Sequence, residues 1–186
     1  MRLREPQVSD KDVEFARVVA THRYALLRYA LRRLEDHSDA EDLVAETFVV
    51  VWRRFDDIPH RDQELFWLYG VAGRVLANVL RGQQRSMRLE MRLALERELE
   101  HDTQRYDDED LTQLMWALSL VKPDERELLQ LTYWESLSYR EVGVVLGCTE
   151  RAAGIRISRA RRHLRQLLNE VDTTATITRL PNQETL

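Results

Sequence analysis

The chain of 186 residues contains only one cysteine, four prolines and six glycines, and these low counts limit the covalent links and the helix breaks that the chain can have. Because Cys148 has no second cysteine, neither an internal disulfide nor a cysteine-based zinc site is available, which favours a reducing, cytoplasmic setting. There is no run of about 18 apolar residues to predict a membrane span, and the polar residues 1–10 are unlike a secretory signal. Few helix breakers and no lasting strand-like alternation predict an all-α chain.

Charge is distributed unevenly along the chain. The net charge of −4 and the pI near 5.8 argue, taken whole, against a nucleic-acid binder. However, residues 147–170 carry six arginines against two acids, whereas residues 88–110 carry four arginines against nine acids. An acidic middle therefore precedes a basic C-terminal segment, and the distribution matters more than the sum.

Three helices are predicted in the first half. The first runs over about 11–34, and the second begins at a capping box formed by Ser38 and Glu41 and ends near Phe55. The third runs over about 62–84. We expect these helices to form one module over residues 11–86, after an N-terminal extension at 1–10 and before a partly helical acidic linker at 87–110.

A second helical module is predicted over residues 111–170, and a flexible tail over 171–186. Pro123 suits the first turn of a helix, and Ser138 with Glu141 forms a second capping box. Gly147 supplies a tight turn, and Thr149 caps a last helix that runs to about Asn169. The fold class is all-α, with two small helical domains joined by a linker.

Residues 138–168 have the pattern of a helix-turn-helix, in which the second helix enters the major groove of DNA. Arg151, Arg156 and Arg159 would reach base edges or phosphates. The arginines further along (Arg161, Arg162 and Arg165) would contact phosphates or only solubilise the helix. The alternative for the whole segment is an exposed basic helix with solvated arginines.

A basic face is also predicted on the third helix. Its members, spaced three or four residues apart, are Arg74, Asn78, Arg81 and Arg85. Such a face suits single-stranded DNA, although a solvated face is an equally open interpretation. His60 precedes it in a loop and could touch DNA, although an exposed side chain without a role is the favoured interpretation. The four tryptophans are assigned to the core. No catalytic constellation, metal-ligand spacing or cofactor motif is found, so we expect no enzyme.

Two blocks of residues resemble extracytoplasmic-function (ECF) sigma factors of the sigma-70 family. Residues 39–48 (DAEDLVAETF) followed by 51–55 (VWRRF) closely resemble region two of that family. Residues 137–142 (LSYREV), with Leu146 and Gly147, and 159–162 (RARR), with Leu164, resemble region four. The resemblance covers about residues 11–169, with both blocks in the family order.

The resemblance implies a subunit that binds core RNA polymerase and directs transcription from specific promoters. Asp42, Glu46 and Arg53 match positions that dock on the clamp helices of the beta-prime subunit. The loop 56–63 and the third helix would capture the melted minus-ten element through His60, Arg74, Asn78, Arg81 and Arg85. Region four would read the duplex minus-thirty-five element, and the expected contacts are Arg140, Thr149, Arg151, Ala152, Ile155, Arg156, Arg159 and Arg162. An anti-sigma factor is an expected partner.

The chain departs from the family pattern at three positions. Arg74 stands where the family often has asparagine, and Ala152 and Gly154 stand where threonine and a basic residue are common.

Two other functions are alternatives to a sigma factor. A response-regulator output module would need a receiver domain, for which 11–86 lacks alternating strands and helices. A regulator that binds polymerase or a partner without being a true sigma factor is the second.

Overall fold

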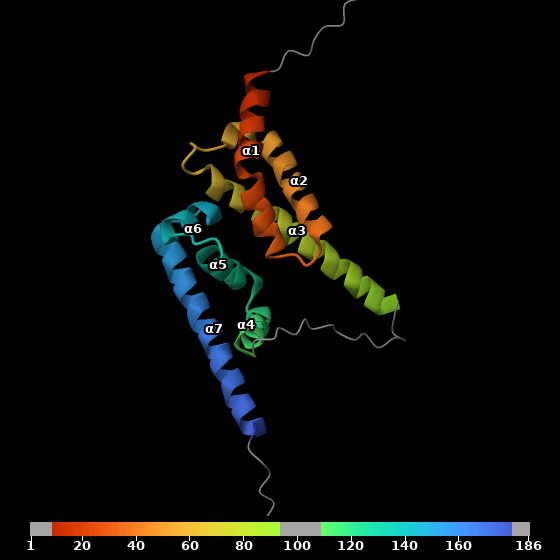
Figure 1. The fold of residues 1–186 in the computed structure, drawn as a ribbon, viewed down its shortest axis with the longest axis vertical. Coiled ribbons are helices and arrows are strands. Elements are labelled where there is room, and N and C mark those ends of the chain that lie inside the picture. The colour runs from red at the N-terminus through yellow and green to blue at the C-terminus, as the bar shows by residue number, and fades with distance from the viewer. Residues whose placement is uncertain (1–8, 94–108, 180–186) are drawn as a thin grey trace, which may run out of the picture. The chain divides into compact units, whose positions relative to one another are not determined.

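The structure of the protein is a computed structural model that describes residues 9–93 and 109–179, with side chains placed for 9–82 and 113–169. The described chain holds helices and turns but no strand, which confirms the all-α fold class. Two compact units are formed, one built on α1–α3 and the other on α4, α5, the start of α6 and α7 (Figure 1). The elements are α1 (Asp10–Leu31), α2 (His37–Arg53), the 3-10 turn η1 (Phe55–Asp57), α3 (Glu64–Leu93), α4 (Glu109–Leu120), α5 (Pro123–Tyr133), α6 (Tyr139–Leu146) and α7 (Glu150–Arg179).

The first unit is a three-helix bundle in which each helix packs on the other two. Leu26 of α1, Leu43 of α2 and Leu68 of α3 are almost completely buried at its centre. The rings of Tyr29 and Tyr69 stack with their centroids 5.1 Å apart, so an aromatic pair joins α1 to α3.

Both of the first two helices begin differently from the sequence prediction. Helix α1 has a capping box that was not predicted, because Ser9 and Asp12 exchange side-chain and backbone hydrogen bonds. The prediction that Ser38 caps α2 was wrong. The cap is Asp36, whose Oδ1 accepts from the backbone N–H of Ser38 at 2.6 Å and of Asp39 at 3.2 Å. An acidic cap also complements the positive end of the helix dipole.

Helices α3 and α7 are longer than predicted. Helix α3 continues to Leu93 instead of ending near residue 84, so the start of the predicted linker is helical. Helix α7 continues to Arg179 instead of ending near Asn169, so residues 171–179 are helical rather than the start of a loose tail. No proline or glycine follows Gly154 until Pro181, and the position before a proline disfavours helix. The remaining linker residues 94–108 and the tail 180–186 lie outside the described residues.

The second unit packs α4 and α5 against α7. Its core cluster consists of Leu118, Val121, Leu129 and Ala160. Pro123 occupies the start of α5 as predicted. The turn before α5 is fixed by Arg126, whose Nη2 donates to the carbonyl oxygens of Ser119 at 2.7 Å and Val121 at 3.2 Å. Arg126 thereby supplies a hydrogen-bond donor for carbonyl oxygens that lack a backbone partner at the end of α4.

The assignment of the tryptophans to the core was wrong for two of them. Trp52 is 38% exposed and Trp116 is 49% exposed, while Trp67 and Trp134 are half-buried. Trp52 still packs on one side, because its ring meets that of Phe15 edge-to-face at 4.9 Å. Each exposed ring therefore presents apolar area to solvent.

Candidate nucleic-acid interface

The turn between α6 and α7 is built by local signals. Ser138 and Glu141 close the predicted capping box, since the Ser138 N–H donates to Glu141 Oε2 at 2.7 Å and the Glu141 N–H donates to Ser138 Oγ at 3.3 Å. Gly147 has a φ of +63°, a left-handed conformation that glycine adopts most readily. Thr149 caps α7 by accepting the N–H of Ala152 at 3.3 Å. These features confirm the helix-turn-helix predicted from sequence.

Close packing holds the two helices of this motif together. Val142 of α6 and Ile157 of α7 are fully buried, as is Ala153. A Cβ on Gly143 would lie 2.8 Å from the carbonyl oxygen of Cys148, so only glycine permits this approach of the turn. The exposed face of α7 is therefore held in a fixed orientation by its buried face.

A side-chain interaction also joins α7 to the rest of its unit. Nδ1 of His163 lies 2.7 Å from Oε2 of Glu125, which joins α7 to α5. The carboxylate is mostly buried and the imidazole is about one-third exposed.

A shallow hollow opens on the exposed face of α7, where a helix-turn-helix contacts DNA. Its volume is about 850 Å³, and the residues lining it include three arginines, Arg151, Arg159 and Arg162, which we call its rim, and one acid, Glu150. All three are exposed, and none makes an ion pair within the described part of the chain. Cationic side chains that lack an internal partner suit phosphate oxygens.

The structure gathers part of the predicted duplex-contacting set in this hollow. Thr149, Arg151, Ile155, Arg159 and Arg162 line it. The other three, Arg140, Ala152 and Arg156, lie outside its lining, with both arginines exposed and the alanine half-buried.

Sequence reasoning missed four further lining residues, Tyr139, Glu150, Gly154 and Ser158. Gly154 was noticed only as a departure from a family pattern. Its role in packing depends on Tyr139, which lies fifteen residues earlier in the chain.

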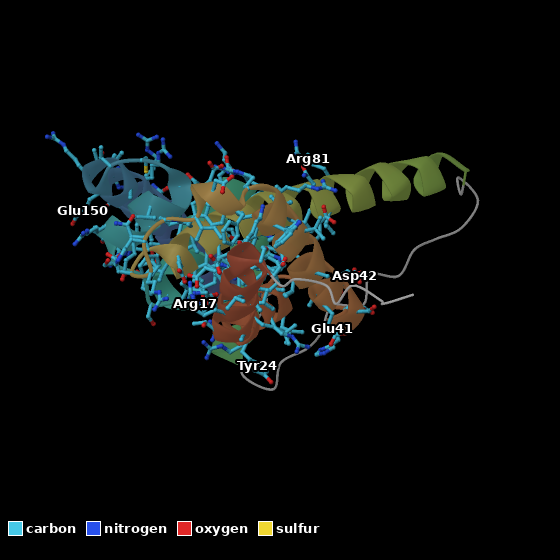
Figure 2. The ribbon with its side chains drawn as sticks, turned by 90° about the horizontal axis from the view of Figure 1, so that it is seen from above. Arg17, Tyr24, Glu41, Asp42, Arg81 and Glu150 are labelled. Carbon is cyan, nitrogen blue, oxygen red and sulfur yellow. The ribbon has the colours of Figure 1, made fainter. Side chains whose placement is uncertain are left out.

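The predicted basic face of α3 is present in the first unit. Arg74, Asn78 and Arg81 are all exposed, and Figure 2 shows the Arg81 side chain projecting from the helix. Nη2 of Arg81 donates to Oδ1 of Asn78 at 2.6 Å, which couples the two side chains. Arg85 continues this helix, but its side chain lies outside the described ones. A side-chain amide that lies between guanidinium groups can hydrogen-bond to one base edge, while the guanidinium groups contact two phosphates.

His60 lies in the loop before α3 and is almost fully exposed. Its Nδ1 lies 2.9 Å from Oδ1 of Asp62, so its described contact is within the loop and not with the basic face of α3. The loop itself is shaped by Arg54, which forms an ion pair with Asp57 at 2.9 Å.

A buried ion pair fixes where this loop ends and α3 begins. Glu64, only 3% exposed, accepts hydrogen bonds from Arg17 and His22 of α1, the latter over 2.9 Å. Burial raises the pKa of the Glu64 carboxyl, but the hydrogen bonds from Arg17 and His22 outweigh burial, so the pKa lies below its ordinary value of 4.5. Arg17 also pairs with Glu14 at 2.9 Å. This network was not predicted from the sequence.

One face of α2 is exposed and mostly acidic. Asp42, Glu46 and Arg53 lie on it at helical spacing, and none makes an ion pair within the described residues. Val49, exposed between them, adds apolar surface that sequence reasoning missed. Figure 2 shows Asp42 and Glu41 at the outer edge of α2. An acidic face around an apolar centre is complementary to a basic helix of a partner.

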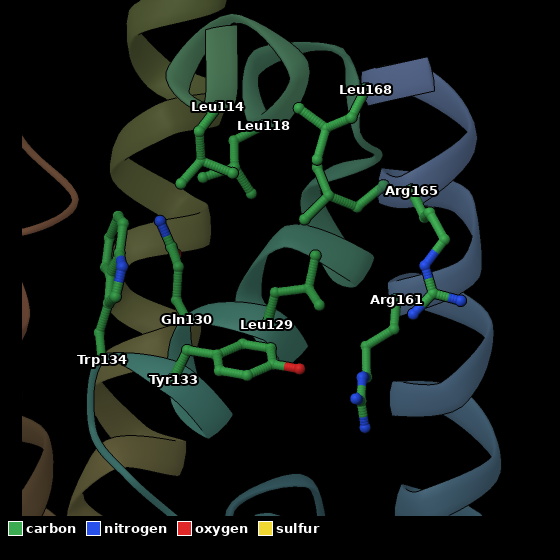
Figure 3. Close-up of a pocket in the computed structure, with 10 residues that line it drawn as sticks. Leu114, Leu118, Leu129, Gln130, Tyr133, Trp134, Arg161, Arg165 and Leu168 are labelled. Atoms are coloured by element: carbon green, nitrogen blue, oxygen red, sulfur yellow. The ribbon is translucent and has the colours of Figure 1, made fainter. Parts of the chain in front are cut away.

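The second unit also has an apolar pocket between α4, α5 and α7, with a volume of about 440 Å³ (Figure 3). Leu114 and Leu118 of α4 face Leu168 of α7 across it, and the guanidinium groups of Arg161 and Arg165 extend from α7 along one wall. Apolar walls beside two cations suit an apolar segment of a partner protein that carries acidic residues.

Two further properties of the described residues concern membranes and metals. Within residues 9–93 and 109–179, no helix has the combination of length and apolar character that a membrane span needs. Over the same ranges no cluster of histidine, cysteine, aspartate or glutamate is arranged to hold a metal ion.

Comparison with protein families matches both units separately. Residues 18–86 match the model of sigma-70 region 2, and residues 111–164 match that of sigma-70 region 4. The two matches fall on α1–α3 and on α4–α7.

Individual proteins agree with the family match. The chain is 30% identical to an RNA polymerase sigma-E factor of Streptomyces avermitilis over 166 residues, which cover 88% of this chain and 89% of that one. It is 29% identical over 128 residues to the ECF RNA polymerase sigma factor SigC of Mycobacterium tuberculosis, covering 69% of each chain. It also resembles the solved sigma factor RpoE bound to the anti-sigma factor NepR from Bartonella quintana, with a TM-score of 0.54, 28% identity, and coverage of 84% of this chain and 97% of that one.

Proposed function

Because this chain belongs to the extracytoplasmic-function sigma factors of the sigma-70 family, we propose that its two units divide the work of promoter selection. As such a factor it binds core RNA polymerase and directs promoter-specific transcription initiation. We assign residues 11–86 to the polymerase and the minus-ten element, and residues 111–170 to the minus-thirty-five element. Residues 87–110 would connect the two. We propose a location in the bacterial cytoplasm, because core polymerase and promoter DNA are the partners of such a factor.

The observation that carries the duplex assignment is the unpaired cationic rim of the hollow on α7. Arg151, Arg159 and Arg162 stand on the exposed face of a helix whose other face is locked by Val142 and Ile157. In a helix-turn-helix this face enters the major groove. Arg140, Thr149, Ala152, Ile155 and Arg156 complete the set that we propose to contact duplex DNA.

The first unit would bind the melted strand and the polymerase through different helices. Arg74, Asn78, Arg81 and Arg85 on α3, together with His60 in the preceding loop, are the proposed contacts to the minus-ten element. Asp42, Glu46 and Arg53 on α2 are the proposed contacts to the clamp helices of the beta-prime subunit. Two units that each bind DNA weakly gain joint affinity for the promoter when one polymerase holds both, because binding of the first raises the effective concentration of the second. An acidic chain can therefore act at promoters.

The proposal is tested by transcription in vitro with core polymerase, with and without the full chain, on a library of native upstream fragments. Expected are new, specific starts that share two spaced sequence elements. If the chain binds core tightly but no start depends on it, the chain is a polymerase-binding regulator and the sigma assignment is wrong.

A matched pair of variants tests the role of the hollow. Arg159→Ala removes an arginine from the rim and should lower initiation at minus-thirty-five-dependent promoters by about tenfold, since a specific arginine contact is worth about 1–3 kcal/mol. Arg165→Ala removes an arginine from the same helix outside that hollow and should leave sequence preference unchanged. Equal losses of preference in both variants would remove the support for the hollow as the reading surface.

We also propose that an anti-sigma factor holds this chain inactive. The RpoE relative has been solved in complex with one, and the apolar pocket beside Arg161 and Arg165 offers a docking place for such a partner. The tagged chain would be recovered from its source cells under inducing and resting conditions. A co-purifying protein that competes with core polymerase and blocks transcription in vitro supports this proposal, and recovery of polymerase alone under all conditions contradicts it.

A further inference from the structure

The uncharged residues that line the hollow on α7, which we call its floor, differ in chemistry from the arginines of its rim. Arg151 and Arg159 precede and follow Ile155 by four residues each, so the three side chains share one face of the helix. Ile155 is 54% exposed, whereas Ile157, two residues later, is fully buried. An apolar side chain therefore stands between two cations on the surface that we propose faces DNA.

Gly154 and Tyr139 extend this apolar floor. A Cβ on Gly154 would lie 3.2 Å from Cδ2 of Tyr139, so the glycine lets the tyrosine ring lie close against the backbone of α7. The Tyr139 hydroxyl accepts a hydrogen bond from Nη1 of Arg161 at 3.4 Å, which holds the far end of the ring. Any larger residue at 154 would contact this ring, and a basic one would bring a charge to the floor.

The position of Ile155 along α7 suits contact with a base. It is in the second turn of a helix that begins at Glu150, and the N-terminal residues of a recognition helix are those that meet base edges. In the major groove only thymine presents a methyl group, and apolar side chains recognise it there. Arginines on either side suit guanine edges or phosphates, but they cannot provide this contact.

We propose that Ile155 reads the C5-methyl group of a thymine in the upstream duplex element, on the apolar floor shared with Gly154 and Tyr139. The inference rests on the proposed function, because it requires that the hollow on α7 faces promoter DNA. It predicts a promoter element with a preferred thymine·adenine pair at the base facing Ile155. Loss of the methyl group should matter there even when all Watson–Crick hydrogen bonds are kept.

The experiment uses holoenzyme reconstituted from core polymerase and the full chain. A promoter library with a randomised upstream duplex element is selected for initiation, and each thymine of the selected element is then replaced by deoxyuridine, which lacks only the methyl group. Initiation should fall about three- to tenfold at one position, the range expected for losing one buried methyl group. The same replacement at other thymines should have little effect.

The matched variant is Ile155→Ala, which removes the apolar contact at an exposed position of the helix and leaves the core intact. This holoenzyme should initiate equally well on thymine and deoxyuridine templates at the sensitive position. Ile155→Val, which keeps two methyl groups, should retain most of the discrimination. Circular dichroism of each variant controls for folding.

Three outcomes would overturn the inference. A selected element without thymine, or one whose thymines all tolerate deoxyuridine, would show that no methyl group is read, while the specific starts would leave the proposed function intact. Undiminished discrimination by Ile155→Ala would assign the contact to another residue. Absence of any specific start would instead contradict the proposed function itself and the inference with it.

Discussion

Nε2 of His22 in α1 lies 2.9 Å from Oε2 of Glu64, the first residue of α3, although 42 residues separate them in the chain. Arg17, five residues before His22, donates to the other carboxylate oxygen of Glu64. Glu64 thereby receives two donors from one helix at the point where the loop carrying His60 enters α3. The pair fixes the start of the helix that carries Arg74, and with it the geometry of the proposed melted-strand surface.

Replacing Glu64 should destabilise the first unit strongly. Glu64→Gln leaves the Arg17 guanidinium partly buried beside a neutral amide, and losing one partner of a buried pair costs about 3 kcal/mol. The matched change Glu14→Gln removes another carboxylate that pairs with Arg17, but an exposed one, and should cost less than about 1 kcal/mol. Urea denaturation followed by circular dichroism compares the two. Similar losses in both variants would mean that the buried pair does not stabilise the fold.

The same carboxylate should make stability depend on pH. The pKa of Glu64 in the folded chain lies below its ordinary value of 4.5, so the unfolded chain binds the proton first as pH falls. The stabilisation is therefore complete above about pH 4.5 and is lost as pH falls through the lower folded pKa. The expected result is a urea midpoint that drops more steeply below pH 4.5 in the natural chain than in Glu64→Gln. Parallel profiles would contradict a lowered pKa.

Two glycines should respond in opposite directions to the same substitution. Gly147→Ala forces a side chain into the left-handed region and should destabilise the turn between α6 and α7 by about 1–2 kcal/mol. Gly82→Ala lies inside α3 with no atom within 4 Å of the new methyl group, and should stabilise the first unit by about 0.5–1 kcal/mol. Thermal denaturation of the two variants provides the measurement. A loss at Gly82 would indicate an unrecognised contact of α3.

Features encoded within a few residues could be predicted from the sequence. The capping box of Ser138 and Glu141 and the turn at Gly147 each depend on neighbours along the chain, and both predictions were confirmed. At α2 the same reasoning was wrong, because Asp36, two residues before Ser38, is a competing cap. Its carboxylate accepts hydrogen bonds from the backbone N–H groups of Ser38 and Asp39. Local signals thus predict that a helix starts but do not decide between adjacent caps.

Contacts between distant residues could not be predicted in this way. Helical periodicity places Trp52 on the inner half of α2, but its ring is 38% exposed although it packs against Phe15 of α1. The hydrogen bond of Glu64 with His22 depends on the crossing of α1 and α3, which no local pattern encodes. The same holds for the approach of Tyr139 to Gly154, so the floor of the proposed reading surface emerges only with the fold.

The acidic face of α2 yields the sharpest prediction about polymerase binding. Glu46→Lys places a cation beside exposed Val49 on the face that also holds Asp42 and Arg53. A basic partner helix attracts the glutamate but would repel the lysine. Core polymerase should therefore bind at least about tenfold more weakly, which corresponds to a loss of at least about 1.4 kcal/mol in binding free energy. The defect should shrink as salt is raised, because exposed charges are screened.

Glu41→Lys is the control for this prediction, because it makes the same charge change on the same helix. Glu41 pairs with His37 at 3.5 Å and lies more than a third of a helical turn away from Glu46 around the helix axis. Its reversal should leave core affinity within about twofold, as expected for an exposed charge outside the interface. Affinity of labelled full chain for core polymerase, measured by fluorescence anisotropy at two salt concentrations, distinguishes the variants. If both reversals weaken binding equally, only the net charge of the chain matters. If neither does, the polymerase docks on another face, and the assignment of Asp42, Glu46 and Arg53 is wrong.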